Sequence, residues 1–147
     1  MNDEPGTETG PEYPMPIEMG KVREFAKATF AYGKAEAGHG SVVPPTFLNI
    51  ADFQWAPRKS NPIHRLGFDI NRQLHGEIEY VFHGSPPAVG DELTAQTRVE
   101  RTYEKAGKRG GTMRFAVLVT EFRAPDGRLV AEERSTVLET PAPEGER

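Results

Sequence analysis

The sequence VPPTFLNIADF, residues 43–53, decides how the chain folds. Proline suits the first turn of a helix, because its missing N–H would be unpaired there in any case. The apolar residues that follow recur at helical spacing and are Phe47, Leu48, Ile50, Ala51 and Phe53. The stretch therefore predicts a helix over residues 46–53 whose apolar face is buried in the core.

Four segments in the second half of the chain alternate between apolar and polar side chains, as half-buried strands do. They are residues 77–83, 93–99, 113–119 and 129–138. Because short turns join them, we expect these strands to pair antiparallel. An earlier helix is expected over residues 21–32, where Val22, Phe25 and Ala26 form one apolar stripe and Gly33 ends it.

Length and pattern together predict one α+β domain, in which a curved antiparallel sheet wraps around one buried helix. We place this domain at residues 13–140. Residues 1–12 and 141–147 are rich in Glu, Gly, Pro and Thr, so both are expected to be disordered tails. The sheet covers the helix on one side only, and a dimer is expected to cover the rest.

Composition excludes several classes of protein and site. The chain has no cysteine, which rules out a thiol nucleophile, a thiolate zinc site and a disulfide framework. A net charge of -4 argues against general nucleic-acid binding. The four histidines lack the spacing of metal ligands, so no metal site is expected. Without a signal peptide or an apolar run of about 20 residues, the chain is expected to be cytoplasmic and without a membrane contact.

Several segments, in order along the chain, resemble the N-terminal-type domain of MaoC-like dehydratases, which share the hot-dog fold. They are residues 22–26, 43–47, 74–77, 89–93, 103–111 and 126–132. The resemblance implies 2-enoyl and 3-hydroxyacyl thioesters as substrates, with coenzyme A or acyl carrier protein as part of the substrate and no separate cofactor. It also implies two hot-dog subunits, identical or not, with the acyl chain in a tunnel between them.

The chain departs from this family after the first helix. Active members carry an Asp there and a His a few residues later, because the reaction needs two groups within hydrogen-bond reach of substrate and water. Residues 29–39 read TFAYGKAEAGH and contain no Asp. We call this Asp–His pair the dyad. The resemblance therefore implies that this chain is the subunit of a heteromeric enzyme that lacks the dyad.

His39 is the candidate catalytic residue of this segment. It is a candidate proton carrier, with Glu36 as the carboxylate that orients it. The alternative is a polar loop residue between two glycines.

Candidate substrate-binding residues lie in two places. We call the helix expected over residues 46–53 the central helix. The N–H groups of Thr46 and Phe47 lie in its first turn, where they are suited to bind a thioester oxygen. Ile50 belongs to its apolar stripe, which would border an acyl tunnel. His75 and Gly76 stand at the entry of a strand, where they line the tunnel or meet the partner subunit. The alternatives are a plain core helix and a buried structural histidine.

Two basic groups are candidates for the phosphates of coenzyme A or for an acidic carrier protein. Arg58 and Lys59 lie in a long loop expected over residues 56–73, and Lys108 and Arg109 lie in a glycine-rich hairpin. The alternative is that both are solvated charged turns.

Three functions remain open from the sequence. The first is a supporting subunit of an (R)-specific enoyl-thioester hydratase or 3-hydroxyacyl-thioester dehydratase, whose dyad-bearing partner supplies Asp and His. The second is a self-sufficient homodimeric hydratase that uses His39 or His75, or a thioesterase that uses a carboxylate such as Glu36 or Asp52. The third is a protein that binds acyl thioesters without turning them over.

Overall fold

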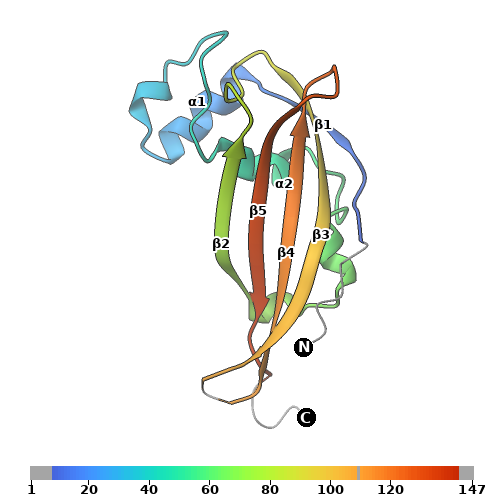
Figure 1. Cartoon of the computed structure of the whole chain (residues 1–147). Helices are drawn as coiled ribbons and strands as arrows, with labels where there is room; N and C mark the ends of the chain where they lie inside the picture. Colours follow the sequence, from blue (N-terminus) through green and yellow to red (C-terminus); the bar gives the residue numbers. More distant parts are fainter. Residues whose placement is uncertain (1–7, 109, 143–147) are drawn as a thin grey trace.

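The computed structural model describes residues 8–108 and 110–142. Its strands are β1 (Tyr13–Pro16), β2 (Gln73–Phe82), β3 (Glu92–Ala106), β4 (Thr112–Arg123) and β5 (Leu129–Glu139). Its α-helices are α1 (Met19–Ala28) and α2 (Ala51–Gln54), and 3-10 turns cover Tyr32–Lys34, Phe47–Ile50, Pro62–Arg65 and Ile70–Arg72. The strands form one antiparallel sheet in the order β1-β3-β4-β5-β2 (Figure 1).

The four predicted strands are all present, and each is longer than predicted. The simple alternation of apolar and polar residues predicts β3 only as far as Val99. The strand continues beyond it, but its register with β4 shifts between Val99 and Arg101. Such a bulge leaves one residue unpaired and moves the following side chains to the other face. The predicted helix over residues 21–32 is present as α1 but ends earlier, at Ala28, and Phe30 then takes a positive φ of 58°.

The central helix lies where the sequence places it, as a 3-10 turn at Phe47–Ile50 that continues into α2. Phe47, Leu48 and Ala51 are buried, as predicted. The prediction for Phe53 is wrong, because its side chain is 82% exposed. Two residues along a helix are about 200° apart, so Phe53 points away from the face that Ala51 buries.

The amino-terminal boundary of the domain lies earlier than predicted, so the tail over residues 1–12 is wrong for residues 8–12. The Gly10 N–H donates to the Thr97 carbonyl at 2.8 Å, and the Val99 N–H donates to the Glu8 carbonyl at 2.8 Å. Residues 1–7 and 143–147 lie outside the described residues. At the other end, Pro141 lies against Gly111.

Strand β1 was not predicted, because its sequence YPMP contains two prolines. A proline has no N–H to donate, so strands that contain it are confined to sheet edges. β1 is such an edge, since it pairs with β3 alone, Tyr13 opposite Ala95 and Met15 opposite Leu93.

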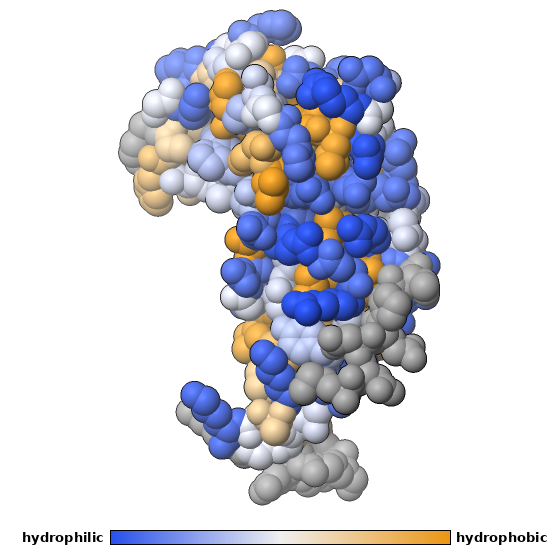
Figure 2. Space-filling model, in the orientation of Figure 1, coloured by the Kyte–Doolittle hydropathy of each residue, from blue (hydrophilic) through white to orange (hydrophobic). Residues whose placement is uncertain are grey.

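We call the sheet face that packs on residues 47–54 the inner face, and the opposite face the outer face. One apolar cluster on the inner face joins Phe47 and Leu48 to sheet residues such as Phe122 and Ala131. A second, smaller cluster contains Val99, Leu118 and Val137 and is covered by Ile63 and Leu66 of the long loop. The outer face is largely charged in Figure 2, where hydrophilic residues cover the middle of the sheet.

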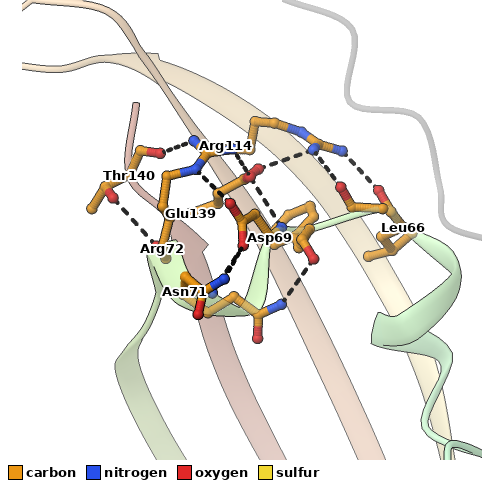
Figure 3. Close-up of polar contacts among 10 residues, drawn as sticks. Leu66, Asp69, Asn71, Arg72, Arg114, Glu139 and Thr140 are labelled. Atoms are coloured by element: carbon orange, nitrogen blue, oxygen red, sulfur yellow. Dashed lines mark hydrogen bonds and ion pairs between the residues drawn. The ribbon is translucent and has the colours of Figure 1, made fainter. Parts of the chain in front are cut away.

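A buried carboxylate fastens the long loop to the far end of the sheet (Figure 3). Glu139 of β5 is only 3% exposed and accepts hydrogen bonds from Arg72 at 2.6 Å and Arg114 at 3.0 Å. The Asp69 N–H donates to the same carboxylate at 3.1 Å. Arg114 also donates to the Leu66 carbonyl at 2.9 Å, so the loop is held to this centre both at Leu66 and at residues 69–72.

Replacing Glu139 should therefore weaken the whole domain. Glu139→Gln leaves Arg114 without its carboxylate partner and Arg72 with Asp69 alone, and we expect a loss of roughly 3 kcal/mol in the free energy of unfolding. Urea unfolding measures this loss. The control Glu79→Gln removes an exposed carboxylate from the outer face and should change stability by less than about 0.5 kcal/mol. Equal effects of the two substitutions would contradict a central role for Glu139.

Candidate functional site

A row of polar side chains crosses the inner face between the two apolar clusters. In the sheet register Glu133 of β5 lies opposite Tyr80 of β2 on one side and Thr120 of β4 on the other. Thr120 in turn lies opposite Thr97 of β3, and their hydroxyl oxygens are 2.8 Å apart. Directly opposed residues share a face of the sheet, so the row runs across four strands.

Glu133 is the ionisable member of this row, and residues 47–54 cover it from the other side. Its carboxyl group is half-buried, and its Oε2 has no hydrogen-bond partner among the described residues. Burial raises the pKa of Glu133, the neighbouring side chains of Tyr80 and Asn49 act against this, and the Asp52 carboxylate adds to it. Glu133 therefore holds its proton to higher pH than an ordinary glutamate.

Two tyrosines flank this carboxyl group. Burial raises the pKa of Tyr80, and the nearby Glu133 raises it further. Burial also raises the pKa of Tyr13, with Asp52 and Glu133 acting in the same direction. Tyr13 is 4% exposed, and the neighbouring Thr97 side chain acts against this rise in pKa. Both phenols therefore stay protonated and remain hydrogen-bond donors at any physiological pH.

We call Asn49, Asp52, Tyr80 and Glu133 the inner-face polar cluster. Its side chains come from residues 47–54, from β5 and from the edge strand β2. Neighbouring apolar side chains are partly exposed to solvent. Phe53 is 82% exposed and Ile78 is 37% exposed. The arrangement can donate and accept hydrogen bonds beside apolar surface, which suits a ligand that has both an oxygen atom and a hydrocarbon part.

The structure places His39 elsewhere, against the turn before β3. A Cβ atom on Gly90 would lie 2.5 Å from Nε2 of His39, so the imidazole rests directly on this glycine. The neighbouring Gly40 N–H donates to the Val89 carbonyl at 2.8 Å. His39 is thus exposed and packs on residues 89–90, whereas the inner-face polar cluster is built from residues 49, 52, 80 and 133.

The start of the central helix is less open than expected. The Phe47 N–H donates to the Pro44 carbonyl at 3.0 Å and is not free for a thioester oxygen. The Phe47 side chain is fully buried against Phe25, at a ring distance of 5.5 Å. Thr46 is exposed and its side chain makes no capping hydrogen bond, while Ile50 is half-buried against the core.

His75 and Gly76 lie on the edge strand β2, where the register with β5 shifts between His75 and Glu77. Both residues are exposed, so His75 is not the buried structural histidine of the alternative. A Cβ atom on Gly76 would lie 3.3 Å from the Thr136 carbonyl oxygen, so the glycine allows a close approach of the two strands.

The two basic groups do not form one patch. Arg58 and Lys59 line a pocket of about 270 Å³ that also includes Asp52. Lys108 lines a different pocket, of about 770 Å³, at the hairpin between β3 and β4. Arg109 lies outside the described residues.

Two further findings concern metal ligands and membrane-spanning helices in the described part of the chain. Residues 8–108 and 110–142 contain no group of three or more His, Asp or Glu side chains placed to hold a metal ion. No helix among these residues is long and apolar enough to cross a membrane.

A family model described as FAS1-like, dehydratase domain region, matches residues 4–133. The chain belongs to this family. A UPF0336 protein of Leifsonia xyli subsp. xyli is 31% identical to this dehydratase-family chain over 105 residues, which are 65% of the chain and 68% of that protein.

Two solved structures from Mycobacterium tuberculosis show the fold. HadBC, a 3R-hydroxyacyl-ACP dehydratase complex, matches with a TM-score of 0.62 at 21% identity, over 88% of this chain and 95% of that one. The ChsH1-ChsH2 complex matches with a TM-score of 0.65 at 16% identity, over 93% and 87% of the two chains. The predicted α+β hot-dog fold is therefore confirmed.

The sequence reasoning missed Glu133, although a signal was present. Strand alternation places Ala131, Glu133, Ser135 and Val137 on one face, and Ala131 and Val137 are buried. A glutamate at an inward position of an otherwise apolar strand face is uncommon, because burial of a carboxylate is costly. This glutamate was therefore the feature of the sequence that indicated the inner-face polar cluster.

The raised pKa of Glu133 predicts how stability depends on pH. The folded chain holds this proton more tightly than the unfolded chain, where the pKa is near 4.5. The contribution of Glu133 to stability is therefore largest below the unfolded pKa and is lost as pH rises through the folded one.

Glu133→Gln should remove this part of the pH dependence, so the variant gains stability relative to the wild type as pH rises. Urea unfolding from about pH 5 to pH 9 measures the difference. Glu79→Gln, on the exposed outer face, should keep the wild-type slope. A wild-type slope in Glu133→Gln as well would show that this carboxyl group is not perturbed.

Proposed function

We propose that this chain is a supporting subunit of an (R)-specific enoyl-thioester hydratase or 3-hydroxyacyl-thioester dehydratase. The observation that carries the proposal is the match of residues 4–133 to a dehydratase family in a chain whose residues 29–39 contain a histidine but no Asp. In hydration, water adds its hydroxyl to C3 of the enoyl group and a proton to C2, and dehydration is the reverse. The Asp and His that move these protons come from a second hot-dog subunit.

The free edge of the sheet supports a second subunit. β2 pairs with β5 only, and no other strand in residues 8–108 and 110–142 covers its outer edge. Apolar side chains are exposed along this strand, with Leu74 at 55%, Ile78 at 37% and Val81 at 38%. An exposed, partly apolar edge strand is a site of association unless something covers it. HadBC and ChsH1-ChsH2 are themselves complexes of two named chains.

The substrate is part of the proposal. We assign it as an acyl thioester of coenzyme A or of acyl carrier protein, so the carrier is part of the substrate and no separate cofactor is needed. The exposed Arg58 and Lys59, and Lys108 with Arg109, are the basic groups available for carrier phosphates or an acidic carrier surface. The apolar stripe with Ile50 provides surface for the acyl chain.

Enzyme assays test this proposal directly. The purified chain is assayed for hydration of crotonyl-coenzyme A, alone and mixed with a dyad-bearing hot-dog subunit. Activity is expected in the mixture and absent from the chain alone. His39→Ala should leave the activity of the mixture within roughly twofold, because the partner supplies the protons. Full activity of the chain alone, lost by about a hundredfold in His39→Ala, would contradict the proposal and make the chain a self-sufficient hydratase.

A matched pair of substitutions tests the role of β2. Val81→Lys places a charge on the free edge strand and should weaken association with the second subunit, because a buried charge at an interface costs free energy. Val42→Lys makes the same change at a position of almost equal exposure, 39% against 38%, far along the sequence from β2. Sedimentation of the mixtures measures both. Equal weakening, or none, would show that β2 is not the interface.

A further inference from the structure

Glu133 occupies a position where an apolar residue would be expected. It lies on the inner face between the cluster that contains Ala131 and the cluster that contains Val137. A carboxyl group there costs free energy unless its hydrogen-bonding capacity is used. Yet its buried Oε2 has no hydrogen-bond partner among the described residues. The inner face therefore offers hydrogen-bonding capacity that the described residues do not use.

We propose that Glu133 is a positioning residue of the substrate site, which holds Tyr80 and Asn49 so that they hydrogen-bond a carbonyl or hydroxyl oxygen of the bound acyl thioester. This inference rests on the proposed function and adds a role to residues that the family resemblance does not assign. Glu133 lies directly opposite Tyr80 in the sheet, and Asn49 faces both of them from the central helix.

The chemistry of the three side chains suits this role. A phenol and a primary amide both donate hydrogen bonds, and a carbonyl or hydroxyl oxygen accepts them. The carboxyl group of Glu133 lies against both donors and can hold them in place. The half-buried Ile50 and the exposed Ile78 and Phe53 lie on the same two elements and offer apolar surface to the hydrocarbon part of the ligand.

The position of Tyr80 on β2 would place the substrate site between this chain and a second subunit. Tyr80 belongs to the strand whose outer edge is free, and Asn49 belongs to the central helix beside it. A ligand held by both therefore lies next to the surface that a second subunit would cover. The polar cluster would hold one oxygen of the substrate while the partner's acid–base pair acts on the neighbouring carbon atoms.

The site should fail when Glu133 ionises. The titratable groups that face it are Asp52 from α2, Tyr80 from β2 and Tyr13 from β1. A carboxylate at Glu133 would be repelled by Asp52 and would draw the Tyr80 hydroxyl away from the ligand. Binding should therefore weaken as pH rises through the raised pKa of Glu133.

Calorimetric titration with butyryl-coenzyme A, a saturated thioester that cannot be hydrated, tests the inference, with the full chain alone and in the mixture with a dyad-bearing subunit. Glu133→Ala and Tyr80→Phe should each weaken binding by about tenfold, because each removes one hydrogen-bonding group from the cluster. Glu133→Gln should retain affinity within about threefold, because its amide can still hold the two neighbours. It should also lose the decline of affinity with rising pH. Glu79→Gln is the matched control and should behave as the wild type.

The outcomes separate this inference from the proposed function. Binding that depends on Glu133, without turnover in any mixture, supports the inference and contradicts the proposed function. Turnover in the mixture with unchanged affinity in folded Glu133→Ala supports the proposed function and overturns the inference. A weakening in Glu133→Ala that Glu133→Gln does not rescue, with no change in pH profile, indicates a purely structural role and also overturns it. No binding and no turnover by the wild type overturns both.

Discussion

The register of β5 between β2 and β4 determines what this chain presents on the inner face of its sheet. It sets Glu133 between Tyr80 and Thr120 and sets Ala131 and Val137 into the two apolar clusters. Side chains alternate between faces, so a slip of one residue would turn Glu133 outward and bring its charged neighbours in. The polar cluster, the core and the free edge therefore depend on one alignment of strands.

Strand β2 links the site to the expected partner. Its inner side contributes Tyr80 to the polar cluster, and its free edge exposes Leu74 and Val81. A subunit that covers this edge would also close the open side of the cluster and exclude water from it, which strengthens hydrogen bonds there. Assembly and substrate binding would then be coupled through a single strand. The buried Glu139 centre supports this arrangement, because it fastens the loop before β2 to the ends of β4 and β5.

The sequence predicted the parts of the fold that follow from local periodicity. The four long strands and the central helix each carry a repeat of apolar residues. β1 was missed because Pro14 and Pro16 are poor strand formers, and it exists only because β3 offers an edge. Phe53 is apolar, but its angle around the helix turns it away from the face that Ala51 buries, so residue type alone predicts the wrong side. The role of Glu133 requires the pairing of β5 with both neighbours, which is a long-range property that no local pattern contains.

The central claim is that a second hot-dog subunit covers β2 beside the polar cluster. Hydrogen–deuterium exchange of the chain, alone and mixed with a dyad-bearing hot-dog subunit, tests it most directly. The account predicts slower exchange in the mixture over residues 73–82 and over residues 47–54, and little change over β1 at the other edge of the sheet. Protection confined to β1 or to the outer face of β3 and β4, with β2 unchanged, would contradict it.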